Sequence, residues 1–216
     1  IGIDRDKDSI RHGELKFLND KGVRLVKGNF RDIKEIVNSQ GFTQVDAILL
    51  DLGLSSHQIE DPERGFSFDR DVKLDMRMDK SQPFTAMELI KEISEEKLGS
   101  ILKEYSDERY YKIIAREIKR EFTAGMINSS FDLKNVVTKV YRKFGNRFVL
   151  DGVSRVFQAL RIEVNQELEN LSIFLNSFPS ILKKNGRIAI IAFHSTEDRL
   201  VKEKFKELAL TCSCPR

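Results

Sequence analysis

The run Val45–Asp51 constrains the fold more than any other part of the sequence. Five of its first six residues are apolar and several are branched, which predicts a short strand buried on both faces. The run ends at Asp51, and Gly53 signals a sharp turn. Open parallel sheets bind their ligands at the carboxyl ends of the strands, so Asp51 is predicted to lie at a ligand-binding edge.

Strands and helices alternate around this run. Ile1–Asp4 is predicted to be the end of a strand, a helix opens at Asp8-Ser9, and Val23–Lys27 is a second strand. A helix over 31–39 separates that strand from Val45–Asp51. This order predicts a parallel α/β sheet with right-handed crossovers.

Residues 53–83 show neither the helical nor the strand period, which is long for a loop. The segment holds too many large apolar side chains for a disordered linker, so we expect it to be ordered and functional. It also mixes cations with aromatic rings, a combination that suits single-stranded nucleic acid, at Arg64, Phe66, Phe68 and Arg77. Composition supports equally well that these aromatic residues anchor the loop to the core.

A helical region follows the loop. Thr85 and Glu88 form a capping box, and helical patterns follow at about 94–105, 107–124 and 131–144. No strand pattern interrupts them. We therefore expect a helical insertion at 85–150 in an α/β domain made of 1–84 and 151–216.

One long helix is predicted from Val153 to Ser177, with Arg161 and Asn165 beside its apolar stripe. These two residues either face a cleft or form the ordinary polar flank of the helix. A buried strand over 187–193 comes next and ends at His194, where Ser195 is expected to cap the last helix.

Five isolated residues have weaker signals. Asp4 is placed like a ribose-binding acid but equally like a helix cap, and Phe30 either packs on an adenine or belongs to the core. His194 follows a strand, although a single histidine is more often structural. Cys212 and Cys214 resemble half of a zinc site, but two ligands do not make one, so no metal site is predicted.

Composition narrows the class of protein. The 216 residues are 40% hydrophobic and 33% charged with a net charge of +3, which is typical of a globular protein and compatible with a nucleic-acid partner. No apolar run approaches 18 residues and no signal-peptide pattern opens the chain, so we expect a cytoplasmic protein without membrane contact. The glycine, serine and histidine motifs of P-loop enzymes, kinases, serine hydrolases and zincins do not occur.

Four long segments go beyond generic α/β features: Asp51–Phe68, Leu74–Asp79, Phe157–Asn165 and Phe193–Arg199. With these segments the chain closely resembles the bacterial small-subunit (16S) ribosomal RNA cytosine-N4 methyltransferases over essentially its whole length. The resemblance implies a Rossmann-like class I methyltransferase sheet with an inserted all-helical domain for RNA recognition. It also implies methyl transfer from S-adenosylmethionine to the exocyclic amine of a cytosine in the decoding region, with ribosomal RNA or the assembled small subunit as the partner.

The resemblance assigns roles to single residues. It implies cofactor contacts at Asp4, Phe30, Asp51 and Gln58. Asp51, Ser55 and, more weakly, His194 are candidates for positioning the amine. Candidate RNA contacts are Arg64, Phe66, Phe68, Arg77, Arg161 and Asn165.

Three departures from the family pattern are visible. His57 stands where the family usually has proline, and Phe148–Arg155 differs from the usual His-Pro-Ala-x-Arg. The first strand and the glycine-rich cofactor loop are missing. We therefore expect that residue 1 is not the natural start, that the C-terminus is truncated, that the fragment is inactive, and that two half-sheets face each other without a central ladder.

Two other functions fit part of the sequence. A non-catalytic RNA-binding module is favoured by the missing cofactor loop. A nicotinamide-dependent dehydrogenase shares the acidic residue after a strand but does not account for the long loop after Asp51.

Overall fold

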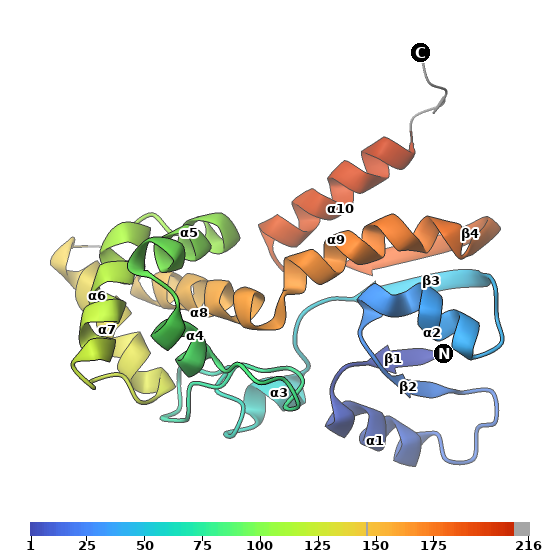
Figure 1. Ribbon diagram of the computed structural model, residues 1–216, viewed down its shortest axis with the longest axis horizontal. Coiled ribbons are helices and arrows are strands. Elements are labelled where there is room, and N and C mark those ends of the chain that lie inside the picture. The colour runs from blue at the N-terminus through green and yellow to red at the C-terminus, as the bar shows by residue number, and fades with distance from the viewer. Residues whose placement is uncertain (146, 210–216) are drawn as a thin grey trace. The chain divides into compact units, whose positions relative to one another are not determined.

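The computed structural model describes residues 1–145 and 147–209, which form two compact units (Figure 1). Unit 1 consists of residues 1–53 and the chain from Glu167 onward, and unit 2 of residues 54–166. Cys212 and Cys214, the half zinc site considered above, lie outside the described residues.

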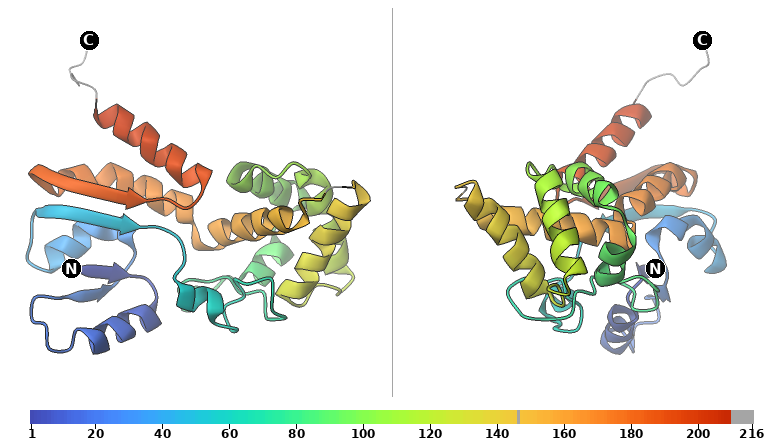
Figure 2. Two further views of the ribbon diagram at one scale, coloured as in Figure 1. Left: turned by 180° about the vertical axis from the view of Figure 1, so that it is seen from behind. Right: turned by 60° about the vertical axis from the view of Figure 1, so that its left-hand side comes forward.

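Unit 1 contains two pairs of parallel strands. β1 (Gly2–Asp4) pairs with β2 (Leu25–Lys27), and β3 (Val45–Asp51) pairs with β4 (Leu182–Ile191). The prediction of a parallel α/β fold is confirmed. Within the described chain the two pairs form separate two-stranded sheets, as expected for half-sheets. The arrows of β1, β3 and β4 point the same way, so their carboxyl ends lie at one end of unit 1 (Figure 2).

The burial predicted for β3 and β4 is wrong. Leu50 is the one buried residue of β3, while Leu49 on the opposite face is 71% exposed. β4 begins earlier than predicted and alternates between half-buried and exposed residues. Among the described residues, the helices of this unit pack against the face that carries Leu50. Since successive side chains of a strand point to opposite faces, Leu49 stays exposed.

The helices of unit 1 build its core. They are α1 (Lys7–Lys16), the 3-10 turn η1 (Phe30–Asp32), α2 (Ile33–Ser39), α9 (Glu167–Ser177), the 3-10 turn η2 (Phe178–Ser180) and α10 (Ser195–Leu208). Ile33 and Val37 of α2 and Leu171, Phe174 and Leu175 of α9 pack with Leu50 of β3.

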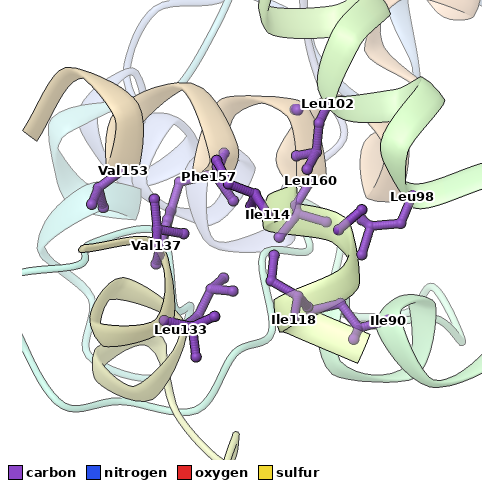
Figure 3. Packing of buried hydrophobic residues seen from close by; sticks show 14 of the residues in the cluster. Ile90, Leu98, Leu102, Ile114, Ile118, Leu133, Val137, Val153, Phe157 and Leu160 are labelled. Carbon is purple, nitrogen blue, oxygen red and sulfur yellow. The ribbon is translucent and has the colours of Figure 1, made fainter. Parts of the chain in front are cut away.

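Unit 2 is helical apart from its long loop. It consists of α3 (Ser56–Glu60), α4 (Ala86–Glu92), α5 (Glu95–Ser106), α6 (Tyr111–Thr123), α7 (Ser130–Lys143) and α8 (Val149–Asn165). The capping box of Thr85 and Glu88 is present. Figure 3 shows the core in which Leu98, Ile114, Leu133 and Leu160 meet from α5, α6, α7 and α8. The unit is wider than the insertion expected at 85–150, because it includes the loop before α4 and all of α8.

The single helix predicted over 153–177 is two helices. α8 ends at Asn165, and Gln166 has the left-handed conformation (φ 51°) that stops an α-helix. The apolar stripe continues through the break, so periodicity alone did not reveal it. The boundary between the two units falls directly after Gln166.

The loop after β3 is ordered, as predicted, and it contains the short helix α3 that the aperiodic pattern did not indicate. Backbone hydrogen bonds tie its parts together: Met76 N donates to Arg64 O (2.8 Å), and Ala86 N donates to Asp75 O (2.7 Å). Gly65 (φ 68°) passes so close to the Lys73 carbonyl that a Cβ could not be accommodated. The loop is therefore a packed part of unit 2.

Candidate active site

The carboxyl ends of β1 and β2 bring Asp4 close to the segment that leads to Phe30. Gly28 N donates to the Asp4 carbonyl (3.0 Å), and Asn29 caps the turn that begins at Phe30. The Asp4 carboxylate accepts the Asp6 N–H (2.7 Å). Burial raises the pKa of Asp4, and the Asp6 N–H opposes this in part. The half-buried ring of Phe30 meets Phe174 edge to face at 5.8 Å.

The ends of β3 and β4 form the second part of this edge. Asp51 is the exposed last residue of β3 and pairs with Ile191. Gly53 (φ 92°) follows, and a Cβ at this position would lie 3.1 Å from the Phe193 ring. The absence of a side chain at Gly53 therefore lets the chain after β4 pack against the chain after β3, which places Asp51 and His194 at the same edge.

His194, and not Ser195 as predicted, is the N-cap of α10. Its Nδ1 accepts the Glu197 N–H (3.4 Å), so the neutral ring carries its proton on Nε2. That Nε2 lies 3.2 Å from Glu197 Oε1, and the other oxygen of Glu197 accepts the Phe193 N–H (2.9 Å). Ligand atoms of Glu167, His194 and Glu197 lie within 4.8 Å of one another. The sequence reading missed Glu197, although a glutamate three residues after a cap is the signature of a capping box.

Ser55 and Gln58 form a capping box at the start of α3 in unit 2. The Ser55 hydroxyl accepts the Gln58 N–H (3.2 Å), and Gln58 Oε1 accepts the Ser55 N–H (3.0 Å). Gln58 is buried. This arrangement fixes the chain shortly after Asp51.

The loop residues proposed to contact RNA differ in exposure. Arg64 is buried and donates to Met78 O (2.9 Å), and its Nε lies 3.3 Å from Asp61. Arg77 is paired in a bidentate manner with Asp75, with both distances 2.8 Å. Phe66 and Phe68 are half-buried against the core of unit 2. Phe66 and Phe68 therefore anchor the loop to the core, which is one of the two interpretations that composition supported equally.

Arg161 and Asn165 lie in the last turns of α8. Asn165 is fully buried: its Oδ1 accepts the Met78 N–H (2.8 Å), and its Nδ2 donates to Met76 O (2.7 Å) and Arg161 O (2.9 Å). Asn165 thus holds the segment Leu74–Asp79 against α8. This contact links two of the four sequence segments that carry the family resemblance.

The strand ends of unit 1 fit an adenosine-type methyl donor. Asp4 offers a carboxylate suited to ribose hydroxyls, Phe30 a half-buried aromatic ring shortly after β2, and Asp51 an exposed carboxylate at the end of β3. The predicted site residues Asp4, Phe30, Asp51 and His194 thus lie at the same end of the strands of unit 1. Ser55, Gln58 and the six RNA candidates lie in unit 2.

Within residues 1–145 and 147–209, no helix is long and apolar enough to cross a bilayer. Three proteins named ribosomal RNA small subunit methyltransferase H align with the entire chain. The protein of Fusobacterium nucleatum is 43% identical and is covered over 68% of its length. Those of Caldicellulosiruptor saccharolyticus and Clostridioides difficile are 41% and 39% identical, each covered over 70%. Residues 1–216 also match the MraW methylase family, and the chain, an α/β protein with methyltransferase architecture, belongs to that family.

Proposed function

We propose that this protein transfers a methyl group from S-adenosylmethionine to the exocyclic N4 of a cytosine in the decoding region of small-subunit ribosomal RNA. The observation that carries the proposal is the set of polar strand ends in unit 1 of a methylase-family chain, with Asp4, Asp51 and His194 at one edge. The names of the relatives support ribosomal RNA as the substrate. The cytosine N4 position and the decoding region follow from the resemblance of the four sequence segments.

Binding of the methyl donor is assigned to Asp4, Phe30, Asp51 and Gln58. Asp4 would accept hydrogen bonds from the ribose hydroxyls, and Phe30 would offer the adenine the side of its ring that Phe174 does not cover. When bound, the donor supplies an electrophilic methyl group on a positive sulfonium, so no metal is needed to activate it.

The reacting amine needs help because its lone pair is delocalised into the cytosine ring. Hydrogen-bond acceptors on the amine protons localise that pair, and we assign this role to the Asp51 carboxylate and the Ser55 hydroxyl. We assign His194 an indirect role. Both of its ring nitrogens face Glu197, and Glu197 accepts the Phe193 N–H, so these contacts orient the chain that follows β4. Most of the acceleration comes from holding the amine in near-attack geometry.

The target base has to leave its stack to reach these groups. Phe66, Phe68, Arg64, Arg77, Arg161 and Asn165 are proposed to form its surroundings. For Arg64 and Asn165, burial makes this contribution indirect: they shape the loop that presents the exposed part of Phe66, Phe68 and Arg77.

Asp51→Asn tests the chemical role. With the donor saturating, we expect single-turnover methylation of small-subunit RNA to fall about 100-fold, the lower end of the range for removing one preorganised hydrogen-bonding group at a reacting centre. Asp46→Asn is the matched control, because Asp46 lies on the same strand but pairs with Lys183 at its other end. An unchanged rate in Asp51→Asn would show that the carboxylate has no such role.

Asp4→Asn tests the binding role separately. Calorimetry should show weaker binding of S-adenosylmethionine. The control Asp20→Asn, which changes an exposed aspartate in the loop before β2, should bind normally.

The variant Asp4→Asn should leave stability at neutral pH unchanged. Because the pKa of Asp4 is raised by burial, its contribution to stability is largest below pH 3.8 and is lost as the pH rises through the folded-state pKa. Asp4→Asn should therefore not lower the free energy of unfolding at pH 7. A loss of both stability and binding would indicate a structural cap instead.

A further inference from the structure

A basic and aromatic surface lies where α7 ends and α8 begins. The sequence from Leu133 to Leu150 contains five lysine and arginine residues and no aspartate or glutamate. The side chains of Arg142, Lys143 and Arg147 are exposed, and so are those of Phe144 (46%) and Phe148 (68%). Two large exposed rings and three cations therefore lie within the seven residues from Arg142 to Phe148.

Phe144 continues an aromatic stack. Its ring lies 5.0 Å from the ring of Tyr110 with an angle of 11° between the planes. The guanidinium of Arg109 lies 5.9 Å from the same Tyr110 ring. One face of Phe144 is thus occupied by Tyr110, and almost half of the residue remains exposed for a further flat group.

A buried polar network makes the base of this stack rigid. Glu108 is 1% exposed and accepts the Tyr141 hydroxyl (2.7 Å), Arg155 Nε (2.9 Å) and the backbone N–H of Tyr110 (2.9 Å). Tyr141 also meets the Tyr110 ring edge to face at 5.2 Å. The ring on which Phe144 stacks is therefore fixed from behind, so little ordering entropy is lost when a ligand stacks in front.

We propose that the surface formed by Arg109, Arg142, Lys143, Phe144, Arg147 and Phe148, here called the Phe144 surface, binds unpaired nucleotides of the RNA substrate. Bases stack on Phe144 and Phe148, and the four cations neutralise the phosphates between them. The inference rests on the proposed function, since it names a second contact with the same RNA.

Charge decides between the possible partners. The exposed acids nearest in sequence are Asp107 and Asp151, so the four cations of the surface exceed them. A second copy of the chain would present the same excess of positive charge and would be repelled, whereas RNA carries one negative charge per nucleotide. Exposed ring faces favour unpaired bases over a duplex, because the bases of a duplex are already stacked on one another.

The test measures binding of the intact protein to a labelled single-stranded RNA of mixed sequence at several salt concentrations. Phe144→Ala and Phe148→Ala should each weaken binding about fivefold to a hundredfold, the range for losing one stacked base. The double variant Arg142→Gln/Arg147→Gln should flatten the slope of log K against log salt by about 1.4, because each phosphate contact to single strands contributes about 0.7.

Matched controls lie elsewhere on the same unit. Phe131 is 44% exposed but lies at the start of α7, about 20 Å along the helix from Phe144. Phe131→Ala and the double variant Lys97→Gln/Arg116→Gln should bind RNA as the wild type does. Melting temperatures and calorimetry with S-adenosylmethionine are used to check that each variant is folded. If Phe144→Ala is unstable, the double variant Arg142→Gln/Arg147→Gln still tests the proposal, because it changes exposed side chains only.

The outcomes separate the two proposals. If the intact wild-type protein neither binds RNA nor methylates small-subunit RNA, the proposed function is wrong. If the wild type does both and the Phe144 and Arg142/Arg147 variants equal it, only the Phe144 surface is refuted. If these variants keep their RNA affinity but dissociate a dimer in sedimentation velocity, the surface joins two copies of the chain and the RNA assignment is overturned.

Discussion

Asn165 shows how one buried side chain supports the long loop. Its amide satisfies the Met78 N–H and the Met76 carbonyl, two backbone groups of a segment that has no regular structure of its own. Asn165→Ala leaves both groups buried without these partners, and each such group costs about 1–3 kcal/mol. We expect the free energy of unfolding in urea to fall by at least 2 kcal/mol. Ser100→Ala, which removes an exposed hydroxyl bonded to Glu96 O, should change it by less than about 0.5 kcal/mol. Equal stability of the two variants would mean that the loop is held by its other contacts.

Tyr141 gives a prediction about pH. Burial and, after it, the hydrogen bond to the Glu108 carboxylate together raise the pKa of Tyr141 to about 12, against a smaller opposing effect of Arg155. The stabilising effect of the protonated hydroxyl is complete below pH 10.0, the ordinary value, and is lost as the pH rises toward 12. The free energy of unfolding should therefore fall between pH 10 and 12 in the wild type and much less in Tyr141→Phe.

The control for this titration is Tyr111→Phe, since Tyr111 is half-buried and its ring contacts Lys103 and Lys112. It should keep the wild-type pH dependence. Absorbance at 295 nm should also show one fewer late-titrating tyrosine in Tyr141→Phe only. A wild type whose stability does not change over this pH range would contradict the burial of the hydroxyl.

At the residue scale, the sequence predicted where the strand-end side chains lie better than which partners the loop and helix side chains have. Asp4 and Asp51 were expected at strand ends and lie there, because the apolar runs before them define the strands. Arg64 and Asn165 were expected to contact RNA, yet both are buried in hydrogen bonds that link segments more than ten residues apart. Spacing along one helix or loop contains no information about such partners.

At the element scale, two glycines inside helices of unit 2 have opposite surroundings. In α8, a Cβ on Gly152 would lie 2.2 Å from the Tyr141 ring, so the glycine lets α7 and α8 approach closely. In α5, a Cβ on Gly99 would meet only ordinary contacts, the nearest at 3.5 Å on Tyr111.

Gly152→Ala should lower the free energy of unfolding by about 1–3 kcal/mol through overpacking. Gly99→Ala should raise it by up to about 1 kcal/mol, because alanine favours the helix. Thermal unfolding measures both, and a change of the same sign in the two variants would contradict this packing.

Helix existence was easier to predict than helix ends. The patterns at 94–105, 107–124 and 131–144 correspond to α5, α6 and α7 because each buries a continuous stripe in one core. The break between α8 and α9 escaped the pattern because Gln166 interrupts the backbone without interrupting the spacing of apolar residues. The exposed face of β3 was not predicted for a different reason. An apolar run shows that a strand could be buried on both faces, but each face is buried only where another element packs against it.

At the scale of the whole molecule, the two units differ in their cores. Twenty-one apolar residues are buried together in unit 2, but nine in unit 1, whose sheets have two strands each among the described residues. Since stability follows buried apolar area, unit 1 should open more readily. In hydrogen-exchange mass spectrometry of a protein comprising residues 1–216, we expect β1, β2 and β3 to exchange before α5–α8. Equal protection of the two units would contradict this difference.

The same experiment repeated with S-adenosylmethionine connects stability to the proposed function. A ligand that binds only the folded state stabilises it by about 2.7 kcal/mol at a concentration 100 times its dissociation constant. Because Asp4, Phe30 and Asp51 belong to unit 1, the added protection should appear at the ends of β1, β2 and β3 and leave α5–α7 unchanged. Asp4→Asn should lose this ligand-dependent protection while keeping the pattern of the free protein. Protection that appears in the helices of unit 2 alone would place the methyl donor away from these strand ends.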